Sequence, residues 1–512
     1  MNKKQKSRFA PIYLSSLTLL SRIFGFLRIN IITYFFGVSA DADIINTLYM
    51  FPSQVRRLLT EGAFSSVFIP RLVSAPSEQA FRTRLRETLF IHWCGVSIVC
   101  LFGFFFSRQI VTLLYRFPQP EQMETLTSLF RWIFLHILFL VLPAVSLIVL
   151  HIKRSFIPGA VAPLIFTGAV ILALLFFAER LGVEAFVIGA TIGAIGQFLV
   201  HYIPYRLMGY SIRPTFHPNW RRIWYMLKRW VLLSIPTIAG ILVNQWSVSL
   251  ASELPVGSVS YLNYALTFFQ FPVGIFTNSI LTVFFPNLSE ANHKQQHRKV
   301  LKIMGWATLQ FWVLLIPSTL YMITHAESLL SLILSPERTN PQDLSNAARV
   351  LQYYAASLFP AAVYLQHLRY YIGIADTKKL LSISALFFVV DVVLSIILIR
   401  TRLGVNGLPI AFFVANTVCA LVLLFQFLRN HKEKPIFSHI FLRFFQTTLV
   451  FCIGYAVLFI STEIFRTLFS NNTRLHHGLI LSITGIIYSL VILGLYRLIK
   501  IRVLKYTLEA PK

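Results

Sequence analysis

The stretch SRIFGFLRIN, residues 21–30, places two arginines, Arg22 and Arg28, inside an apolar run that extends over residues 11–37. A helix of this length can cross the ~30 Å hydrocarbon core of a bilayer. The run is longer than the apolar part of a signal peptide and is interrupted by charge, so we interpret it as a first membrane span. One arginine at the centre of a lipid-facing span costs ~2.5–3.5 kcal/mol. Both arginines are therefore expected to face protein or water.

The composition of the whole chain is that of a polytopic membrane protein. Of the 512 residues, 56% are apolar, 15% are aromatic and only 13% are charged, with a mean hydropathy of +0.68. A soluble chain of this length would need many more charged residues to cover its surface. The four cysteines lie in apolar runs without a C-x-x-C pair, so we expect neither a disulfide framework nor a metal site.

Apolar runs of roughly 20 residues or more recur along the chain and predict an all-α fold with about fourteen transmembrane helices. The predicted spans lie near residues 10–36, 43–70, 88–114, 124–150, 156–178, 183–205, 226–252, 257–287, 303–325, 346–374, 379–399, 405–428, 438–462 and 477–499.

The distribution of basic residues between the connecting segments indicates the orientation of these spans. The segments on one side, with both termini, carry 30 Lys and Arg, whereas those on the other side carry seven. Basic residues concentrate in short cytoplasmic loops, so both termini are predicted to be cytoplasmic. Basic loops that face an anionic leaflet also account for most of the net charge of +27, and no nucleic-acid partner is expected.

Two pairs of similar proline motifs indicate an internal repeat. Pro52 and Pro272 are 220 residues apart, and Pro143 and Pro360 are 217 residues apart. A repeat of this length holds six spans, an even number, so both copies enter the membrane from the same side. We predict a first lobe over residues 1–215 and a second over 216–430, facing one another across a central cavity. Residues 431–512 then form two additional helices.

The second predicted span is unusually polar and contributes a third arginine, Arg56, close to Pro52. Guanidinium groups keep their charge and bind phosphate oxygens through paired hydrogen bonds, which suits a diphosphate in an apolar cavity. The alternative is that Arg28 or Arg56 forms an internal ion pair with Asp43 or Glu61, or reaches a lipid headgroup.

The segments SRIFGFLR and ADADIINTLYMFPSQVRRLLTEGAFSSVFIP resemble the N-terminal signature of the MurJ/MviN lipid II flippase family, in the MOP exporter superfamily. The resemblance implies a monomeric flippase in the bacterial inner membrane, not an enzyme. Such a protein moves an undecaprenyl-diphosphate-linked peptidoglycan precursor from the cytoplasmic to the periplasmic leaflet by alternating access. It also implies that Arg22, Arg28 and Arg56 bind the diphosphate, and that Asp43 and Glu61 belong to the cavity and its gating.

The sequence departs from this family pattern at two places. Ile29 follows Arg28 where many members have Asp, and Leu266 and Thr267 occupy positions where the family often has an acid and an arginine. The contribution of the second lobe to the anion site is therefore expected to differ.

The chain contains no Gly-Lys dipeptide and hence no Walker A loop, so ATP hydrolysis is not expected to drive transport. Asp391 lies deep in the eleventh predicted span, where a carboxylate is a functional candidate. The resemblance suggests a monovalent cation site, Na⁺ or H⁺, with Asp391 as a ligand; the membrane potential is another driving force. A neutral acid bonded to a neighbouring helix is the alternative, and no other cofactor is expected.

Two other functions fit parts of the sequence. A drug exporter of the same superfamily shares the two-lobe design, but its cavity should be acidic or apolar in order to hold cations. A membrane-embedded transferase acting on polyprenyl phosphates would need an acidic metal site or a carboxylate base.

The last two predicted spans, which lie outside the repeat, contain no charge in their central stretches. We expect them to form an apolar groove for a lipid tail, opened by small residues. Ordinary helix packing is the alternative explanation for small residues at these positions. The residues concerned are Gly454, Ala456, Gly485 and Gly494.

Overall fold

The computed structural model describes residues 3–60, 63–215, 218–374, 376–430, 435–468 and 474–499. Every regular element in these ranges is a helix, which confirms the predicted all-α class. The chain divides into two compact units, Met1–Ser260 and Tyr261–Lys512. This division places the seventh predicted span in the first unit, whereas the repeat predicts a boundary near residue 215. The assignment of lobes remains a prediction.

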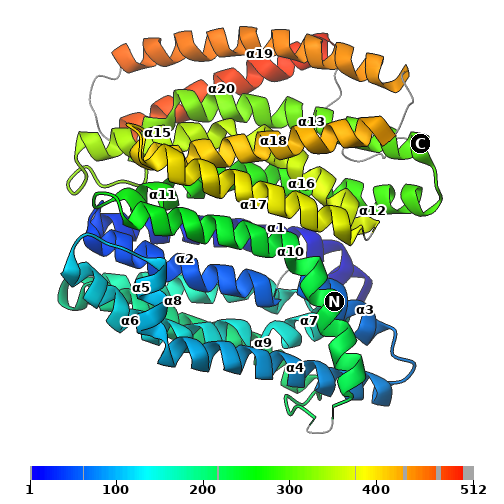
Figure 1. Cartoon of the computed structure of the whole chain (residues 1–512). Helices are drawn as coiled ribbons and strands as arrows, with labels where there is room; N and C mark the ends of the chain where they lie inside the picture. The colour runs from blue at the N-terminus through cyan, green and yellow to red at the C-terminus, as the bar shows by residue number, and fades with distance from the viewer. Residues whose placement is uncertain are drawn as a thin grey trace. The chain divides into compact units, whose positions relative to one another are not determined.

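The first unit contains ten helices in the described residues (Figure 1). They are α1 (Lys3–Phe36), α2 (Ala40–Thr60), α3 (Ala63–Val73), α4 (Glu78–Phe105), α5 (Ser107–Leu114), α6 (Pro120–Val141), α7 (Ala144–Ile152), α8 (Ile157–Leu181), α9 (Val183–Leu207) and α10 (Trp220–Ser252).

The next helix begins in the first unit and continues in the second, where the remaining helices follow (Figure 1). These are α11 (Ser258–Pro272), a π-helical turn (Val273–Thr277), α12 (Asn278–His293), α13 (His297–Thr324), α14 (Ala326–Ser331), α15 (Pro341–Ala356), α16 (Leu358–Gly373), α17 (Thr377–Ile399), a 3₁₀ turn (Gly404–Asn406), α18 (Gly407–Asn430), α19 (Pro435–Leu468) and α20 (Arg474–Leu498).

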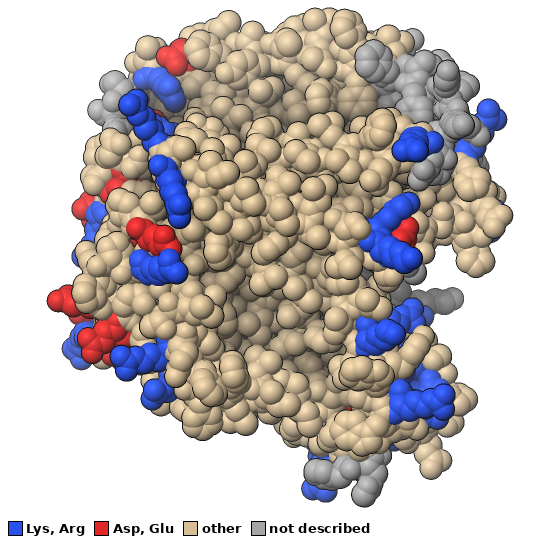
Figure 2. Space-filling model, in the orientation of Figure 1, with Lys and Arg blue, Asp and Glu red and all other residues tan. Residues whose placement is uncertain are grey.

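Twelve stretches of the described chain are helical, long and apolar enough to cross a membrane. The two other predicted spans, 43–70 and 346–374, are more polar. Their described residues lie in the helices α2 and α3 for the first, and α15 and α16 for the second. The fourteen predicted spans therefore all correspond to helices. Figure 2 shows that large parts of the surface in view carry no charged side chain, as expected for a membrane protein.

The prolines of the predicted repeat lie close to interruptions of the helices. Pro143 separates α6 from α7, and Pro360 lies in the first turn of α16, just after the break at Ser357. Pro272 ends α11 at the π-helical turn, whereas Pro52 lies inside α2. Proline has no backbone N–H and crowds the preceding turn, which explains these local breaks.

Glycines on α9 allow it to approach α8 closely, and the two helices run side by side in Figure 1. A Cβ atom at Gly193 would lie 2.7 Å from the carbonyl oxygen of Phe166, and one at Gly189 would lie 2.6 Å from the Cβ of Ala173. Small residues spaced four apart are a common basis of helix association in membranes, because the backbones can meet.

The helices α19 and α20 pack against α13 within the second unit. The hydroxyl groups of Tyr321 and Tyr496 donate hydrogen bonds of 2.7 Å to backbone carbonyls across these contacts. The buried His325 lies within 3.2 Å of the hydroxyl oxygens of Thr462 on α19 and Thr484 on α20. Polar contacts inside an apolar interface fix the register of these helices.

We predict that Gly193→Ala destabilises the protein, because the added methyl group meets the backbone of α8 and the helices must separate. Overpacking of this kind typically costs ~1–3 kcal/mol. Gly168→Ala on α8 is the matched control, since nothing lies within 4 Å of its added methyl group. Thermal unfolding in detergent should show a lower midpoint for Gly193→Ala only. Equal midpoints would contradict the close approach of α8 and α9.

Candidate functional site

Arg28 lies inside the first unit and contacts an aromatic ring of the next helix. Its side chain is buried, with 7% of the residue exposed, and its guanidinium carbon lies 3.8 Å from the centre of the Tyr49 ring on α2. A guanidinium over an aromatic face is stabilised electrostatically, more strongly when both groups are removed from water. The Nε atom of Arg28 is buried and has no hydrogen-bond partner in the described part of the chain.

Arg56 lies one turn after Pro52 on α2 and is half-buried. The positive charge of Arg56 interacts electrostatically with Tyr49 and with His136 of α6. Tyr49 thus has Arg28 on its ring and Arg56 close by, so two of the three predicted diphosphate ligands share one neighbour. Arg22, two turns before Arg28 on α1, is exposed and does not share the buried environment of Arg28.

The polar side chains of α2 explain why this predicted span is less apolar than the others. Gln54 donates a 2.9 Å hydrogen bond to Asn244 on α10, and Asn46 donates a 3.0 Å bond to the hydroxyl of Ser260. A polar group surrounded by apolar atoms is costly unless it finds a partner. The partners of α2 lie within the first unit, so this helix is held by specific hydrogen bonds as well as by packing.

Asp43, predicted to belong to the cavity and its gating, is only 1% exposed and accepts three hydrogen bonds. One carboxylate oxygen accepts from the amide and hydroxyl of Ser260 at 2.8 and 2.7 Å, and the other accepts from the amide of Gly257 at 2.7 Å. A carboxylate at the first turn of α11 satisfies amides that have no partner within that helix. Gating by Asp43 remains a prediction, and Glu61 lies outside the described residues.

Asp391 lies on α17 in the second unit and is fully buried. One of its oxygens accepts a long bond of 3.5 Å from the hydroxyl of Ser395, and the other has no partner in the described residues. Among those residues, no group of three or more His, Cys, Asp or Glu is arranged to hold a metal ion. An incompletely bonded buried carboxyl has oxygen atoms available for a small cation or a proton. Cation binding at Asp391 remains a prediction.

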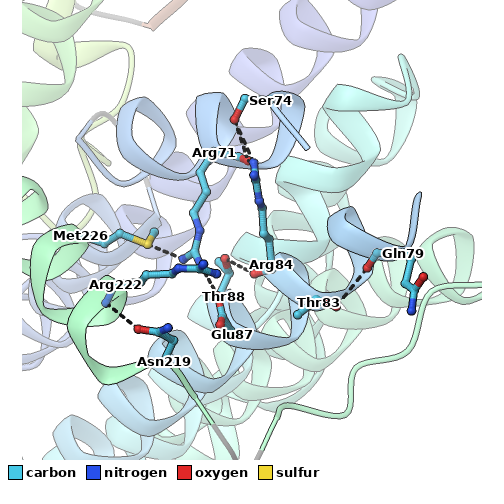
Figure 3. A network of polar contacts seen from close by, with 10 residues as sticks. All are labelled: Arg71, Ser74, Gln79, Thr83, Arg84, Glu87, Thr88, Asn219, Arg222 and Met226. Atoms are coloured by element: carbon cyan, nitrogen blue, oxygen red, sulfur yellow. Dashed lines mark hydrogen bonds and ion pairs between the residues drawn. The ribbon is translucent and has the colours of Figure 1, made fainter. Parts of the chain in front are cut away.

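Arg71 and Arg84, which lie between two predicted spans, belong to a polar network at the ends of α3, α4 and α10 (Figure 3). Arg71 forms an ion pair with the buried Glu87 and contacts the sulfur of Met226. Arg84 donates to the carbonyl of Arg71 at 2.7 Å and so caps the end of α3. Figure 3 also shows Arg222, on the first turn of α10, pointing toward Arg71 and Glu87.

The network holds one carboxylate among several cations. Burial and the neighbouring charges of Arg84 and Arg222 lower the pKa of Arg71, whereas Glu87 opposes that shift. Glu87 therefore compensates charge repulsion between three helices. Its position at the start of an apolar run was the available signal in the sequence, since an acid there needs a partner inside the protein.

We predict that Glu87→Gln destabilises the protein by about 2–3 kcal/mol, because Arg71 loses its buried counter-charge. Glu78→Gln is the control: its partner Arg82 is exposed, and such surface pairs contribute ~0–1 kcal/mol. Thermal unfolding midpoints of the two purified variants decide the matter. Equal midpoints would mean that the Glu87 pair does not stabilise this part of the fold.

Known proteins are similar to this chain in sequence and in fold. A family model described as "Lipid II flippase MurJ" matches residues 32–477. A probable lipid II flippase MurJ from Borreliella burgdorferi is 28% identical over 426 residues, covering 83% of this chain and 84% of that protein. One from Aquifex aeolicus is 27% identical over 433 residues, covering 81% and 82%.

Two solved structures show the same fold. A lipid II flippase MurJ in an inward closed conformation aligns with a TM-score of 0.78 at 23% identity, over 95% of this chain and 99% of that chain. An inward-facing multidrug resistance MATE transporter of the MOP superfamily aligns with a TM-score of 0.65 at 14% identity, over 82% and 98%. Since the family model covers most of the sequence, from the end of α1 to the start of α20, this chain belongs to the lipid II flippase MurJ family.

Proposed function

We propose that this protein translocates lipid II from the cytoplasmic to the periplasmic leaflet of the bacterial inner membrane. The observation that carries the proposal is the pair of arginines around Tyr49 in the first unit of a MurJ family chain. The diphosphate of a polyprenyl-linked substrate cannot remain in hydrocarbon, and fixed cations inside the spans stabilise it there.

Arg28 is the better placed of the two for a ligand within the protein. It is buried, it keeps its charge, and its Nε donor has no partner in the described residues. A phosphate oxygen would supply that missing acceptor, and Tyr49 would hold the guanidinium plane in place. Arg56, half-buried on the next helix, would add a second positive charge.

Transport is proposed to proceed by alternating access, driven by a monovalent cation at Asp391 or by the membrane potential. An ion can bias the two states of a transporter only if it binds one state more tightly than the other. Asp391 suits such a role because one oxygen lacks a partner in the described residues. The proposal includes that the protein acts as a monomer, has both termini in the cytoplasm, and catalyses no chemical reaction of its own.

A drug exporter remains the second candidate because the MATE transporters share the fold. A fold alone does not determine the transported molecule. The buried Arg28 favours an anionic substrate, since an exporter of cationic drugs would need a cavity without a fixed positive charge.

The role of α19 and α20 in holding the lipid tail is part of the proposal, but two of the four small residues serve packing. A Cβ at Gly454 would lie 2.5 Å from Ile492, and one at Gly485 would lie 3.1 Å from the hydroxyl of Tyr321. Ala456 is exposed, and nothing lies within 4 Å of a Cβ added at Gly494. A tail groove, if formed by small residues, would therefore run along these last two positions.

We predict that Arg28→Ala abolishes complementation of a lipid II flippase depletion strain, with the wild-type chain rescuing growth. Loss of a charge-assisted hydrogen bond, ~1.5–3 kcal/mol, should weaken binding of a short-chain lipid II analogue at least ten-fold. Arg28→Lys should rescue only in part, because an ammonium keeps the charge but not the planar fork. Arg57→Ala is the control, since Arg57 adjoins Arg56 but is exposed. Full rescue by Arg28→Ala, at equal membrane levels, would refute the assignment.

For Asp391, we predict that Asp391→Asn removes the dependence of flipping on Na⁺ or pH and slows it several-fold, without lowering the amount of folded protein. The amide has nearly the same shape but neither a negative charge nor a titrating proton. Flipping in proteoliposomes across Na⁺ and pH gradients measures this, with Glu290→Gln, an exposed acid of the same unit, as the control. Unchanged cation dependence in the Asn variant would exclude Asp391 as the coupling site.

A further inference from the structure

The first unit contains a small pocket of about 80 Å³ between α2, α7, α8 and α9. Its polar lining comes from two helices: Arg56 and Thr60 on α2, and Gln197 and His201 on α9. Side chains of α6, α7 and α8 form the apolar remainder of the wall. Since one water needs ~10–15 Å³ on this measure, the pocket has room for several waters or for a small polar group.

His201 is the most informative residue of the pocket. It is 3% exposed, and its Nδ1–H donates a 2.8 Å hydrogen bond to the backbone carbonyl of Gln197 on its own helix. The Nε2 atom, at the opposite edge of the ring, is buried and has no partner in the described residues. A buried polar atom without a bond is costly, so a ligand or water in the pocket would stabilise it.

The charges around the pocket favour an anion. Arg56 contributes a permanent positive charge, and the residues that line the pocket in the described chain include no carboxylate. The titratable neighbours are also bases. His151 at the end of α7 interacts electrostatically with His201, and His136 of α6 interacts in the same way with Arg56. The residues of α8 that line the pocket have no titratable side chain.

The donors of the pocket match a phosphate group. A guanidinium, a side-chain amide and an imidazolium Nε2–H together can satisfy several oxygen acceptors, whereas a halide ion offers one centre. The hydroxyl of Thr60 is not counted, because it donates to the carbonyl of Arg56. We propose that this pocket binds a phosphate group, with Arg56 supplying the charge and Gln197 and His201 supplying further hydrogen bonds. The inference rests on the proposed function in one respect, namely that the phosphate belongs to the headgroup of the transported lipid.

The pocket adjoins the site around Tyr49, because Arg56 belongs to both. Arg56 is near Tyr49, which Arg28 contacts, and it also lines the pocket. Its guanidinium has several donors, so it can serve acceptors on more than one side. Gln197 and His201 are therefore proposed as binding residues in addition to the arginines.

Binding of inorganic pyrophosphate to the purified full-length protein in lipid nanodiscs tests the proposal, with the thermal midpoint followed against ligand concentration. We expect His201→Phe and Gln197→Leu to weaken binding about ten-fold, which corresponds to ~1.4 kcal/mol. His201→Gln, which retains a donor, should restore part of the affinity. His92→Phe is the matched control, because His92 is a buried histidine of the same unit whose Nε2 is bonded to the carbonyl of Val141.

A pH series separates a binding role of His201 from a structural one. Protonation of Nε2 creates a donor, so pyrophosphate should bind more tightly at pH 6 than at pH 8 in the wild type. His201→Phe should lose this extra pH dependence, and the comparison of the two proteins cancels the titration of the probe itself. The same affinity and pH profile in the wild type, His201→Phe and Gln197→Leu would overturn the proposal.

If His201→Phe does not fold, filling the pocket with a larger side chain tests phosphate binding independently. Ala162→Met places a larger apolar side chain at the lining of α8 and should reduce pyrophosphate binding, whereas Ala178→Met, buried on the same helix but not lining the pocket, should not. Equal binding by both variants would overturn the proposal.

Competition by a short-chain lipid II analogue identifies the source of the phosphate. Displacement of pyrophosphate supports the headgroup assignment, and binding without displacement refutes it in favour of free phosphate. Failure of the proposed function is seen separately. If the chain does not complement the depletion strain but pyrophosphate binding follows the predicted pattern, the phosphate pocket is supported and the proposed function is refuted. If the chain complements the strain but pyrophosphate binding does not follow the pattern, only the phosphate pocket is refuted.

Discussion

The cost of keeping a fixed positive charge away from water governs the first unit of this protein. A guanidinium cannot escape that cost by releasing its proton, so its surroundings must compensate it. For the buried Arg28 the compensation is the face of the Tyr49 ring. The polar residues of α2 follow from the same constraint, since Asn46 and Gln54 each bond to a partner within the unit.

The same fold serves transporters with different substrates, so the side chains carry the functional assignment. The likeness to the MATE transporter, at 14% identity, concerns the helical framework only. What separates this chain from an exporter of cations is the charge on α1 and α2. Leu266 and Thr267 stand where the family often has an acid and an arginine, so the proposed anion site depends on these helices of the first unit.

Helicity, the fourteen spans and the family could be predicted from the sequence because each rests on many residues or on a long motif. The partners of Asp43 could not, since they are backbone amides and a hydroxyl more than 200 residues away that leave no sequence pattern. Arg71 and Glu87 lie beside predicted spans, and only the structure identifies them as partners.

Single residues in apolar runs were the hardest to interpret. His201 has the same appearance in the sequence as any buried histidine. What distinguishes it is a pocket beside its Nε2 atom, which has no partner in the described residues. In the sequence, Gly454 is equally compatible with a lipid groove and with a helix contact. Its close approach to Ile492 shows that it serves a helix contact. The geometry of neighbours, which a sequence does not contain, settles such cases.

The glycine contact between α8 and α9 has a mechanical consequence. At Gly193 and Phe166 the backbones of the two helices are in contact, so neither helix can slide or rotate without a steric clash. We therefore expect α8 and α9 to move as one rigid body. The contacts of α2 are different, because they include hydrogen bonds between side chains, such as Gln54 with Asn244, in place of close backbone contact. In the proposed transport cycle we therefore expect bending of the first unit at α2 and α10 rather than at α8 and α9.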